Sequence, residues 1–163
     1  MSIRSRLFAM PMPGFLRRAC IARLAELTAE AFGVNPPPAC TLGCYASFTA
    51  EQAGRAPQGT ADRLFSGARY LGARLRMRLG IRKIDEALAV MRALYRVIGV
   101  DFRGTSEGFV IARCSFSSTY SLQVCRLISS LDEGLIFGLT GGKRMSFTRR
   151  ITEGAAFCGG VLA

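Results

Sequence analysis

Hydrophobic residues recur every three or four positions through most of the first hundred residues, a spacing typical of amphipathic helices. A first helix is predicted over residues 15–32, because its apolar side chains share one face and a glycine follows as a stop signal. A longer helix is predicted to begin at Thr60 or Asp62 and to continue to about Ile98, with Gly80 as a candidate break. The N-terminal half is therefore expected to be helical.

Two segments of this half do not fit a helix. Asn35–Pro38 holds three consecutive prolines, which are excluded from helix interiors and from central strands. Residues 52–60 are rich in glycine, alanine and proline and predict a linker. Cys40 and Cys44 follow the proline loop at a spacing that matches neither zinc knuckles nor redox pairs, so we expect structural thiols there.

From Val97 onward the apolar positions alternate, as they do in half-buried strands. The turn residues 103–106 separate Val100 and Phe102 from residues 109–116, a pattern that predicts a β-hairpin. On the second strand of this hairpin the alternation places four side chains on the inward side, namely Val110, Ala112, Cys114 and Phe116.

The chain returns to helical spacing after the hairpin. A third helix is predicted to begin after Ser117 or Ser118, which are suitable N-cap residues, and to end before Gly134. Cys125 and Asp132 fall on the same face of this helix.

Two further strands are predicted near the C-terminus. Residues 144–152 alternate as a half-buried strand, and a short final strand carries Cys158. Residues 135–139 fit either a strand or a continuation of the third helix. In residues 144–152 one side holds Met145, Phe147, Arg149 and Ile151.

Together these elements predict an α+β fold, in which a helical N-terminal half packs on a small antiparallel sheet formed by the C-terminal half. The 163 residues suit a single domain with a buried core. Within it, residues 1–60 hold the first helix and the Pro/Gly-rich loop. Residues 61–163 hold the long basic helix, the hairpin, the third helix and the C-terminal strands.

Basic residues outnumber acidic residues by 22 to 11, which gives a net charge of +11. The densest basic patch lies on the second predicted helix, where no acid occurs between Asp62 and Asp85. Such a helix face binds nucleic acid, an anionic surface or an acidic partner in some proteins and is simply solvated in others. We call it the 63–83 patch; it consists of Arg63, Arg69, Arg74, Arg76, Arg78, Arg82 and Lys83.

No stretch reaches the roughly 20 apolar residues of a transmembrane segment. The run Leu7–Leu16 is too short and too often broken by proline for a secretory signal. A cytoplasmic location with reduced cysteines is therefore expected. An organelle transit peptide is the alternative, because the first 25 residues hold five arginines and no acid.

The chain contains no histidine, so it lacks the usual base at neutral pH and the commonest metal ligand. Thiols, carboxylates and arginines remain as candidate functional groups. Of the six cysteines, Cys114, Cys125 and Cys158 each lie on the inward face of a predicted element, so we expect them to converge. The simplest of three interpretations is that these thiols fill the core.

A metal site is the second interpretation. Thiolates from Cys114, Cys125 and Cys158, with a fourth ligand from a nearby acid or cysteine, suit zinc or an iron–sulfur cluster. The third interpretation is a catalytic cysteine whose thiolate is stabilised by an arginine or by the helix N-terminus after Cys114. Without an imidazole, Asp132, Glu133 or Glu153 would have to transfer protons. The arginines considered are Arg113, Arg126, Arg149 and Arg150.

The C-terminal half contains the segments Cys114-Ser-Phe, Cys125-Arg-Leu, Leu131-Asp-Glu-Gly134 and Phe147-Thr-Arg-Arg-Ile-Thr-Glu-Gly154, with Cys158 after the last. Over about Tyr95 to Leu162 these segments resemble the C-terminal part of the L-2-amino-thiazoline-4-carboxylic acid hydrolase-like family. The cysteine-and-glycine ending also resembles 4-vinyl reductase type small-molecule-binding domains. After Cys158 the chain departs from the hydrolase-like pattern, because glycines replace an acidic or polar residue.

The resemblance implies a small-molecule hydrolase or a ligand-binding protein, and it nominates Cys114, Cys125, Asp132, Gly154 and Cys158. We expect a pocket between the third helix and the sheet that holds a small anionic or heterocyclic molecule, whose carboxylate pairs with Arg149 or Arg150. The predicted catalytic residues are Cys114, Cys158, Asp132 and Glu153, and the predicted ligand-binding residues are Arg149, Arg150 and Gly154. The alternative function is a non-enzymatic module that binds nucleic acid or an anionic surface through the 63–83 patch.

Overall fold

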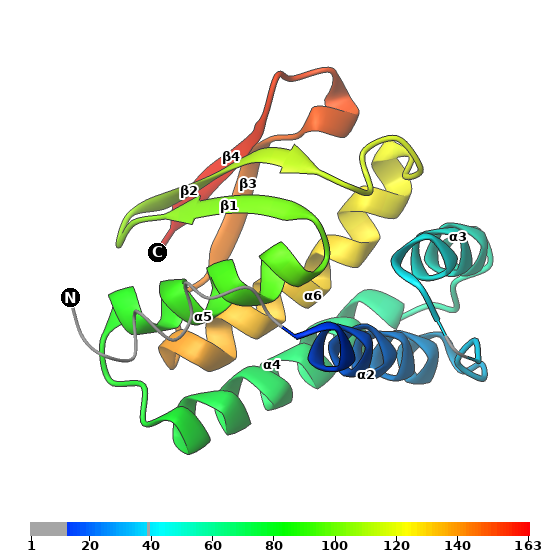
Figure 1. Cartoon of the computed structure of the whole chain (residues 1–163). Helices are drawn as coiled ribbons and strands as arrows, with labels where there is room; N and C mark the ends of the chain where they lie inside the picture. The colour runs from blue at the N-terminus through cyan, green and yellow to red at the C-terminus, as the bar shows by residue number, and fades with distance from the viewer. Residues whose placement is uncertain (1–12, 39) are drawn as a thin grey trace.

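The computed structural model describes residues 13–38 and 40–163 and shows the predicted α+β architecture. Within these residues, five α-helices lie mostly in the N-terminal half, and four strands in the C-terminal half form one antiparallel sheet (Figure 1). In chain order the elements are α2 (Gly14–Phe32), α3 (Leu42–Ala53), α4 (Thr60–Leu79), α5 (Ile84–Val97), β1 (Val100–Gly104), β2 (Gly108–Cys114), α6 (Leu122–Thr140), β3 (Met145–Arg149), the short 3₁₀ helix η1 (Ile151–Glu153) and β4 (Cys158–Leu162).

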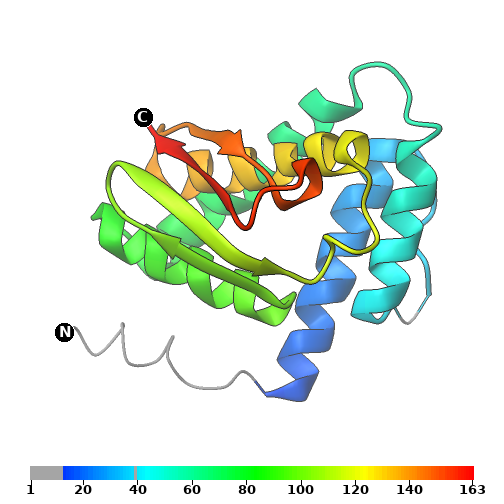
Figure 2. The same ribbon diagram turned by 90° about the horizontal axis from the view of Figure 1, so that it is seen from above.

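The sheet has the strand order β1-β2-β4-β3, and all neighbouring strands are antiparallel. In Figure 1 the sheet forms the upper layer, α5 and α6 lie beneath it, and α4 forms the lowest layer. The helices α2 and α3 lie side by side at one end, as the view from above also shows (Figure 2). The main hydrophobic core fills the space between the sheet and the helices and includes Tyr45, Met91, Phe102, Ile136 and Leu139.

The helical half contains one helix more than predicted. This helix, α3, begins directly after the proline loop, where the Thr41 hydroxyl accepts a hydrogen bond from the Cys44 amide (3.2 Å). The predicted long helix is divided at Gly80, whose φ of 62° is the left-handed conformation that favours glycine. None of the helices in the described part of the chain is long and apolar enough to cross a membrane.

The predicted end of the third helix at Gly134 is wrong. Ser121 caps α6 by accepting a hydrogen bond from the Val124 amide (3.3 Å), so the helix begins later than expected. It then runs through Gly134 and ends at Gly141, where φ is 80°. Residues 135–139 are therefore a continuation of this helix, which was one of the two alternatives.

Glycines inside α4 and α6 allow these two helices to pack backbone against backbone. Gly134 and Gly138 of α6 lie so close to α4 that an added Cβ atom would collide with the carbonyl oxygens of Phe65 and Arg69, respectively. Gly72 of α4 is in the same position relative to α6. These glycines therefore serve close helix packing, and the helices continue through them.

Candidate functional site

A largely apolar cavity of about 280 Å³ lies in the main core between the sheet and the helices. This volume is near the lower end of the roughly 300–1,000 Å³ typical of small-molecule pockets. Most of its wall is aliphatic or aromatic and includes Leu24, Ile128 and Phe147. Thiols and other polar groups on the wall belong to Cys20, Arg23, Cys114, Cys125, Ser129, Asp132, Arg150 and Cys158, and to the phenol rings of Tyr45, Tyr95 and Tyr120.

Three cysteines that are far apart in the sequence meet at this cavity. Cys114 lies at the end of β2, Cys125 on α6 and Cys158 on β4, and all three line the cavity wall, as expected from their inward faces. Cys40 and Cys44 lie elsewhere, with their sulfur atoms 3.2 Å apart. All six cysteines are free thiols.

A β-bulge turns Cys114 toward the cavity. Simple alternation along β2 groups Cys114 with Val110 and Ala112, yet these two residues are exposed and Ile111 is buried. The pairing with β1 shifts its register so that Ala112 has no partner, and an extra residue in one strand reverses the alternation that follows it. The predicted inward position of Cys114 is therefore correct, but the predicted inward positions of Val110 and Ala112 are wrong.

A second bulge decides which of two neighbouring arginines reaches the cavity. Alternation groups Arg149 with the apolar Phe147, but the pairing of β3 with β4 skips Thr148. As a result Arg149 is exposed, with its guanidinium 5.0 Å from the centre of the Phe157 ring. Arg150 is buried instead and lines the cavity.

Arg150 has a polar and aromatic environment and, among the described residues, no carboxylate at ion-pair distance. Its guanidinium donates a hydrogen bond to the Ser129 hydroxyl (2.5 Å), approaches the Cys125 sulfur (3.6 Å) and lies 4.0 Å from the centre of the Phe147 ring. The side chain is only 8% exposed. Within residues 13–38 and 40–163 it forms no ion pair, and residues 1–12 and 39 contain no acid.

Asp132 is a group that can gain or lose a proton near neutral pH. Its carboxyl lines the cavity, and removal from bulk water raises its pKa from an ordinary value of 3.8 to about 7. The nearby Tyr95 hydroxyl and Arg150 guanidinium lower this pKa, whereas Glu133 raises it further. The buried Tyr95 hydroxyl completes no hydrogen bond among the described residues, so it approaches Asp132 without reaching full hydrogen-bond geometry.

The thiols of Cys114 and Cys158 are not activated as nucleophiles. Burial raises the pKa of the Cys114 thiol to about 11, an effect that a hydrogen bond from the Phe116 backbone offsets only in part. Burial also raises the pKa of Cys158, although the Ile151 amide donates a hydrogen bond to its sulfur (3.2 Å). Both thiols are expected to be protonated at pH 7, so a thiolate stabilised by an arginine finds no support at either residue.

Three predicted site residues lie outside the cavity. Glu153 is exposed at the end of η1 and forms an ion pair with Arg126 (2.8 Å). Gly154 follows with a φ of 89° and ends η1, while Arg149 is exposed on the sheet. The structure thus separates Arg149, Glu153 and Gly154 from Asp132 and the cavity thiols.

The three cavity thiols do not form a metal site. Among residues 13–38 and 40–163, no three cysteine, aspartate or glutamate side chains are placed to hold a metal ion together. The predicted zinc or iron–sulfur site at Cys114, Cys125 and Cys158 therefore has no geometric support. The sulfur atoms of Cys125 and Cys158 instead face nitrogen donors.

Polar residues of the cavity that were missing from the prediction are Arg23, Ser129 and the three tyrosines Tyr45, Tyr95 and Tyr120. Ser129 lies on the same face of α6 as Cys125 and Asp132, so the helical pattern contained the signal that would have found it. The tyrosines count as core residues in the hydrophobic pattern. Their buried hydroxyl groups are the overlooked signal, because such groups need a partner.

No protein-family model, curated protein or solved structure matches this chain. The resemblance to the hydrolase-like family therefore stays a prediction, and the cavity with its polar residues is the basis for assigning a function.

Proposed function

We propose that the protein binds a small molecule with an apolar body and one anionic end in the cavity lined by Cys114, Asp132 and Arg150. The observation that carries this proposal is the buried Arg150 guanidinium, which lines the cavity and forms no ion pair with the described residues, although Asp132 is near enough to be influenced by its charge. A buried cation without a counter-ion is costly. A carboxylate on the ligand would offset this cost through paired, charge-assisted hydrogen bonds.

The distribution of polar groups suggests how such a ligand would lie. Leu24, Ile128 and Phe147 offer apolar surface for its body, and Arg150 marks the position of its charged end. Asp132 is uncharged below about pH 7 and ionised above it. Because the ionised form repels a carboxylate, the affinity for an anionic ligand is expected to rise as the pH falls through this value.

Binding of 3-phenylpropionate, a carboxylate with a small apolar body, tests the proposal by isothermal titration calorimetry. The variant Arg150→Met keeps an unbranched apolar stem but removes the charge, so its affinity should fall at least about tenfold. Arg149→Met is the matched control, because it removes the exposed neighbour and should bind like the wild-type protein. An equal loss in both variants would contradict the assignment of Arg150.

A second variant tests the cavity without changing the charge. Ile128→Phe adds a ring to the cavity wall and should exclude the probe, while circular dichroism verifies the fold. Unchanged binding by Ile128→Phe would mean that 3-phenylpropionate binds elsewhere and would overturn the proposal.

Hydrolysis of a carboxylate-bearing heterocycle is a second candidate function, favoured by the pKa of about 7 at Asp132. With 2-amino-thiazoline-4-carboxylate as the ligand, ionised Asp132 would take a proton from a water molecule whose oxygen adds to the ring carbon between nitrogen and sulfur. The carbon–sulfur bond then breaks, and the two protons of the water end on the ring nitrogen and on the departing sulfur. In this scheme Cys114 and Cys158 remain neutral wall residues.

The reaction would release a product with a free thiol. Chromatography separates this product from the cysteines of the protein, so that the released thiol can be measured. Its rate should rise with pH and level off above about pH 7, because the base must be ionised. Asp132→Asn should lower the rate at least about 100-fold, and Cys114→Ser should retain most of it. No thiol release by the wild-type protein would exclude this reaction and leave the binding proposal intact.

A further inference from the structure

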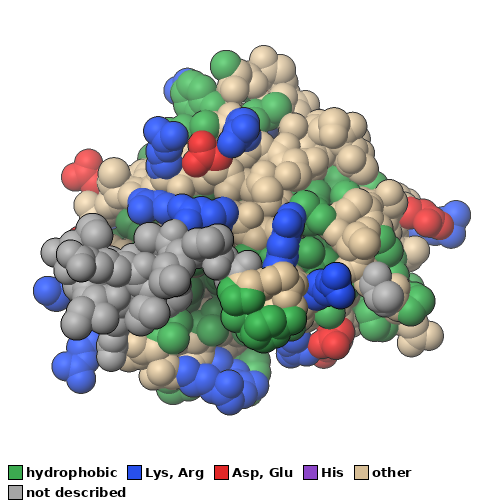
Figure 3. Space-filling view, viewed as in Figure 1, with side chains coloured by type: hydrophobic (Ala, Val, Ile, Leu, Met, Phe, Trp, Pro, Cys, Tyr) green, Lys and Arg blue, Asp and Glu red, His purple; other side chains and the backbone are tan. Residues whose placement is uncertain are grey.

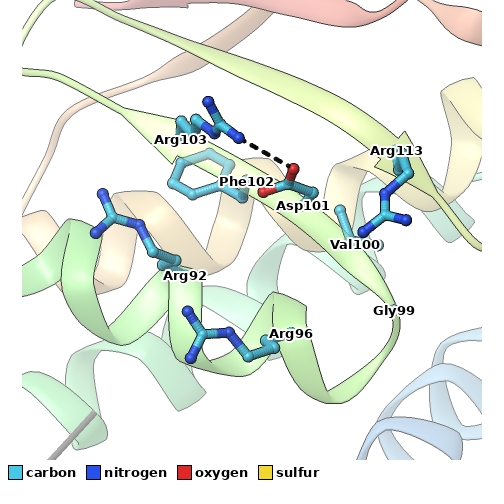
Figure 4. A pocket seen from close by; sticks show the side chains of 8 residues that line it. All are labelled: Arg92, Arg96, Gly99, Val100, Asp101, Phe102, Arg103 and Arg113. Carbon is cyan, nitrogen blue, oxygen red and sulfur yellow. Dashed lines mark hydrogen bonds and ion pairs between the residues drawn. The ribbon is translucent and has the colours of Figure 1, made fainter. Parts of the chain in front are cut away.

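A second concave site lies on the outside of the molecule, where α5 meets the β1–β2 hairpin. It is a depression of about 790 Å³ that shares only Val100 with the wall of the internal cavity. Arg92 and Arg96 approach it from α5, and Arg103 and Arg113 from the hairpin (Figure 4). Four guanidinium groups from three elements therefore surround one hollow.

The positive charge of this depression is largely uncompensated. Asp101 is the one acid on its wall, and its carboxylate is 3.5 Å from Arg103. Arg92, Arg96 and Arg113 form no ion pair and donate no side-chain hydrogen bond to any residue in the ranges 13–38 and 40–163. The residues outside these ranges contain no acid that would neutralise them.

Many other arginines of the chain have internal partners. Arg17 donates to the Val97 carbonyl (3.1 Å) and Arg63 to the Ala31 carbonyl (2.8 Å), while Arg126 pairs with Glu153. Arg96, in the last turn of α5, also offsets the negative end of the helix dipole. Arg92 and Arg113 have no such role, although both line the same hollow.

The number of guanidinium groups indicates what kind of anion fits. A guanidinium forms paired hydrogen bonds with phosphate oxygens. Arg92, Arg96 and Arg113 have no acidic partner in the described part of the chain, whereas one phosphate group carries at most about two negative charges. We propose that this depression binds a ligand with two or more linked phosphate groups. Such groups occur on soluble polyphosphate compounds and on phosphorylated lipid headgroups.

Titration calorimetry with inorganic tripolyphosphate tests this proposal. The triple variant Arg92→Gln, Arg96→Gln, Arg113→Gln should weaken binding at least about tenfold at about 50 mM salt. The matched control is Arg74→Gln, Arg78→Gln, Arg82→Gln, which removes the same charge from exposed positions outside the depression. The control should change the affinity less than about twofold.

Vesicles with and without a phosphoinositide, prepared otherwise identically, distinguish the two sources of phosphate. If the wild-type protein binds tripolyphosphate and the triple variant binds it more weakly, the site is assigned to a soluble ligand. Binding only to the phosphoinositide vesicles, again lost in the triple variant, assigns it to a lipid headgroup. Equal losses in the triple variant and its control, or no binding of either probe by the wild-type protein, would overturn the proposal.

Discussion

Asp132 links the stability of the protein to pH. The carboxyl of this residue stays neutral in the folded protein up to about pH 7, whereas in the unfolded chain it loses its proton near pH 3.8. The folded state therefore binds more protons than the unfolded state between these two values. The contribution of this residue to the free energy of unfolding is full below about pH 4 and is lost as the pH rises through about 7.

Replacement of Asp132 by asparagine should remove this dependence. The variant is expected to exceed the wild-type protein in its free energy of unfolding by roughly 2–4 kcal/mol at about pH 8, and to lie close to it at about pH 4. Urea denaturation at the two pH values measures the difference. The control is Glu51→Gln, because an exposed carboxyl with a long, exposed ion pair contributes less than about 1 kcal/mol to stability. A variant less stable than wild type at high pH would contradict a raised pKa.

The positions of individual site residues were predictable on the helix and less so on the strands. Cys125 and Asp132 share a face because α6 is regular between them. Cys114 and Arg150 each follow a bulge, and the position of a bulge depends on the partner strand. Local alternation therefore could not decide between Arg149 and Arg150.

At the scale of elements, the contact between α4 and α6 depends on glycine. Gly134→Ala should lower the free energy of unfolding by roughly 1–3 kcal/mol, because the new Cβ atom would meet the backbone of Phe65. Gly43→Ala in α3 is the matched control. Its Cβ atom would meet open space, so a gain of up to about 1 kcal/mol from helix propensity is expected. Thermal and urea denaturation test both, and a neutral Gly134→Ala would mean that the helices can separate without cost.

The sequence does not reveal whether a glycine ends a helix or lies within one. Gly33 and Gly80 end helices, with φ of 72° and 62°, whereas Gly134 continues one. The difference comes from the helix packed against Gly134, which local sequence does not contain. The helix α3 was missed for a related reason, since only a short segment separates the proline loop from the predicted linker.

The 63–83 patch is partly used inside the fold. Arg63 donates to the carbonyl of Ala31, and the Arg69 guanidinium lies 5.3 Å from the centre of the Phe137 ring. Fewer free cations therefore remain on α4 than the sequence indicates. Binding of nucleic acid or an anionic surface through this patch stays a prediction.

At the scale of the whole molecule, basic side chains are spread over the surface and acidic ones are few, as the face in Figure 3 shows. The net charge of +11 was evident from composition, but the grouping around the α5–hairpin depression was not. Its members are dispersed among three elements, so no local run of arginines marks them. The fold class was predictable, because it follows from the periodicity of regular elements. The meeting of three thiols was predicted correctly, but Cys114 reaches the cavity through a bulge that the alternation did not indicate.

The two sides of the internal cavity differ in how far they can yield. On the helical side, α4 and α6 touch through their main chains, so these two helices cannot move closer together to make room. The sheet is a single layer whose outer face, at Val110 and Val161, is exposed to solvent. A bulkier guest would therefore find room by displacing the strands more readily than by moving α6 toward α4.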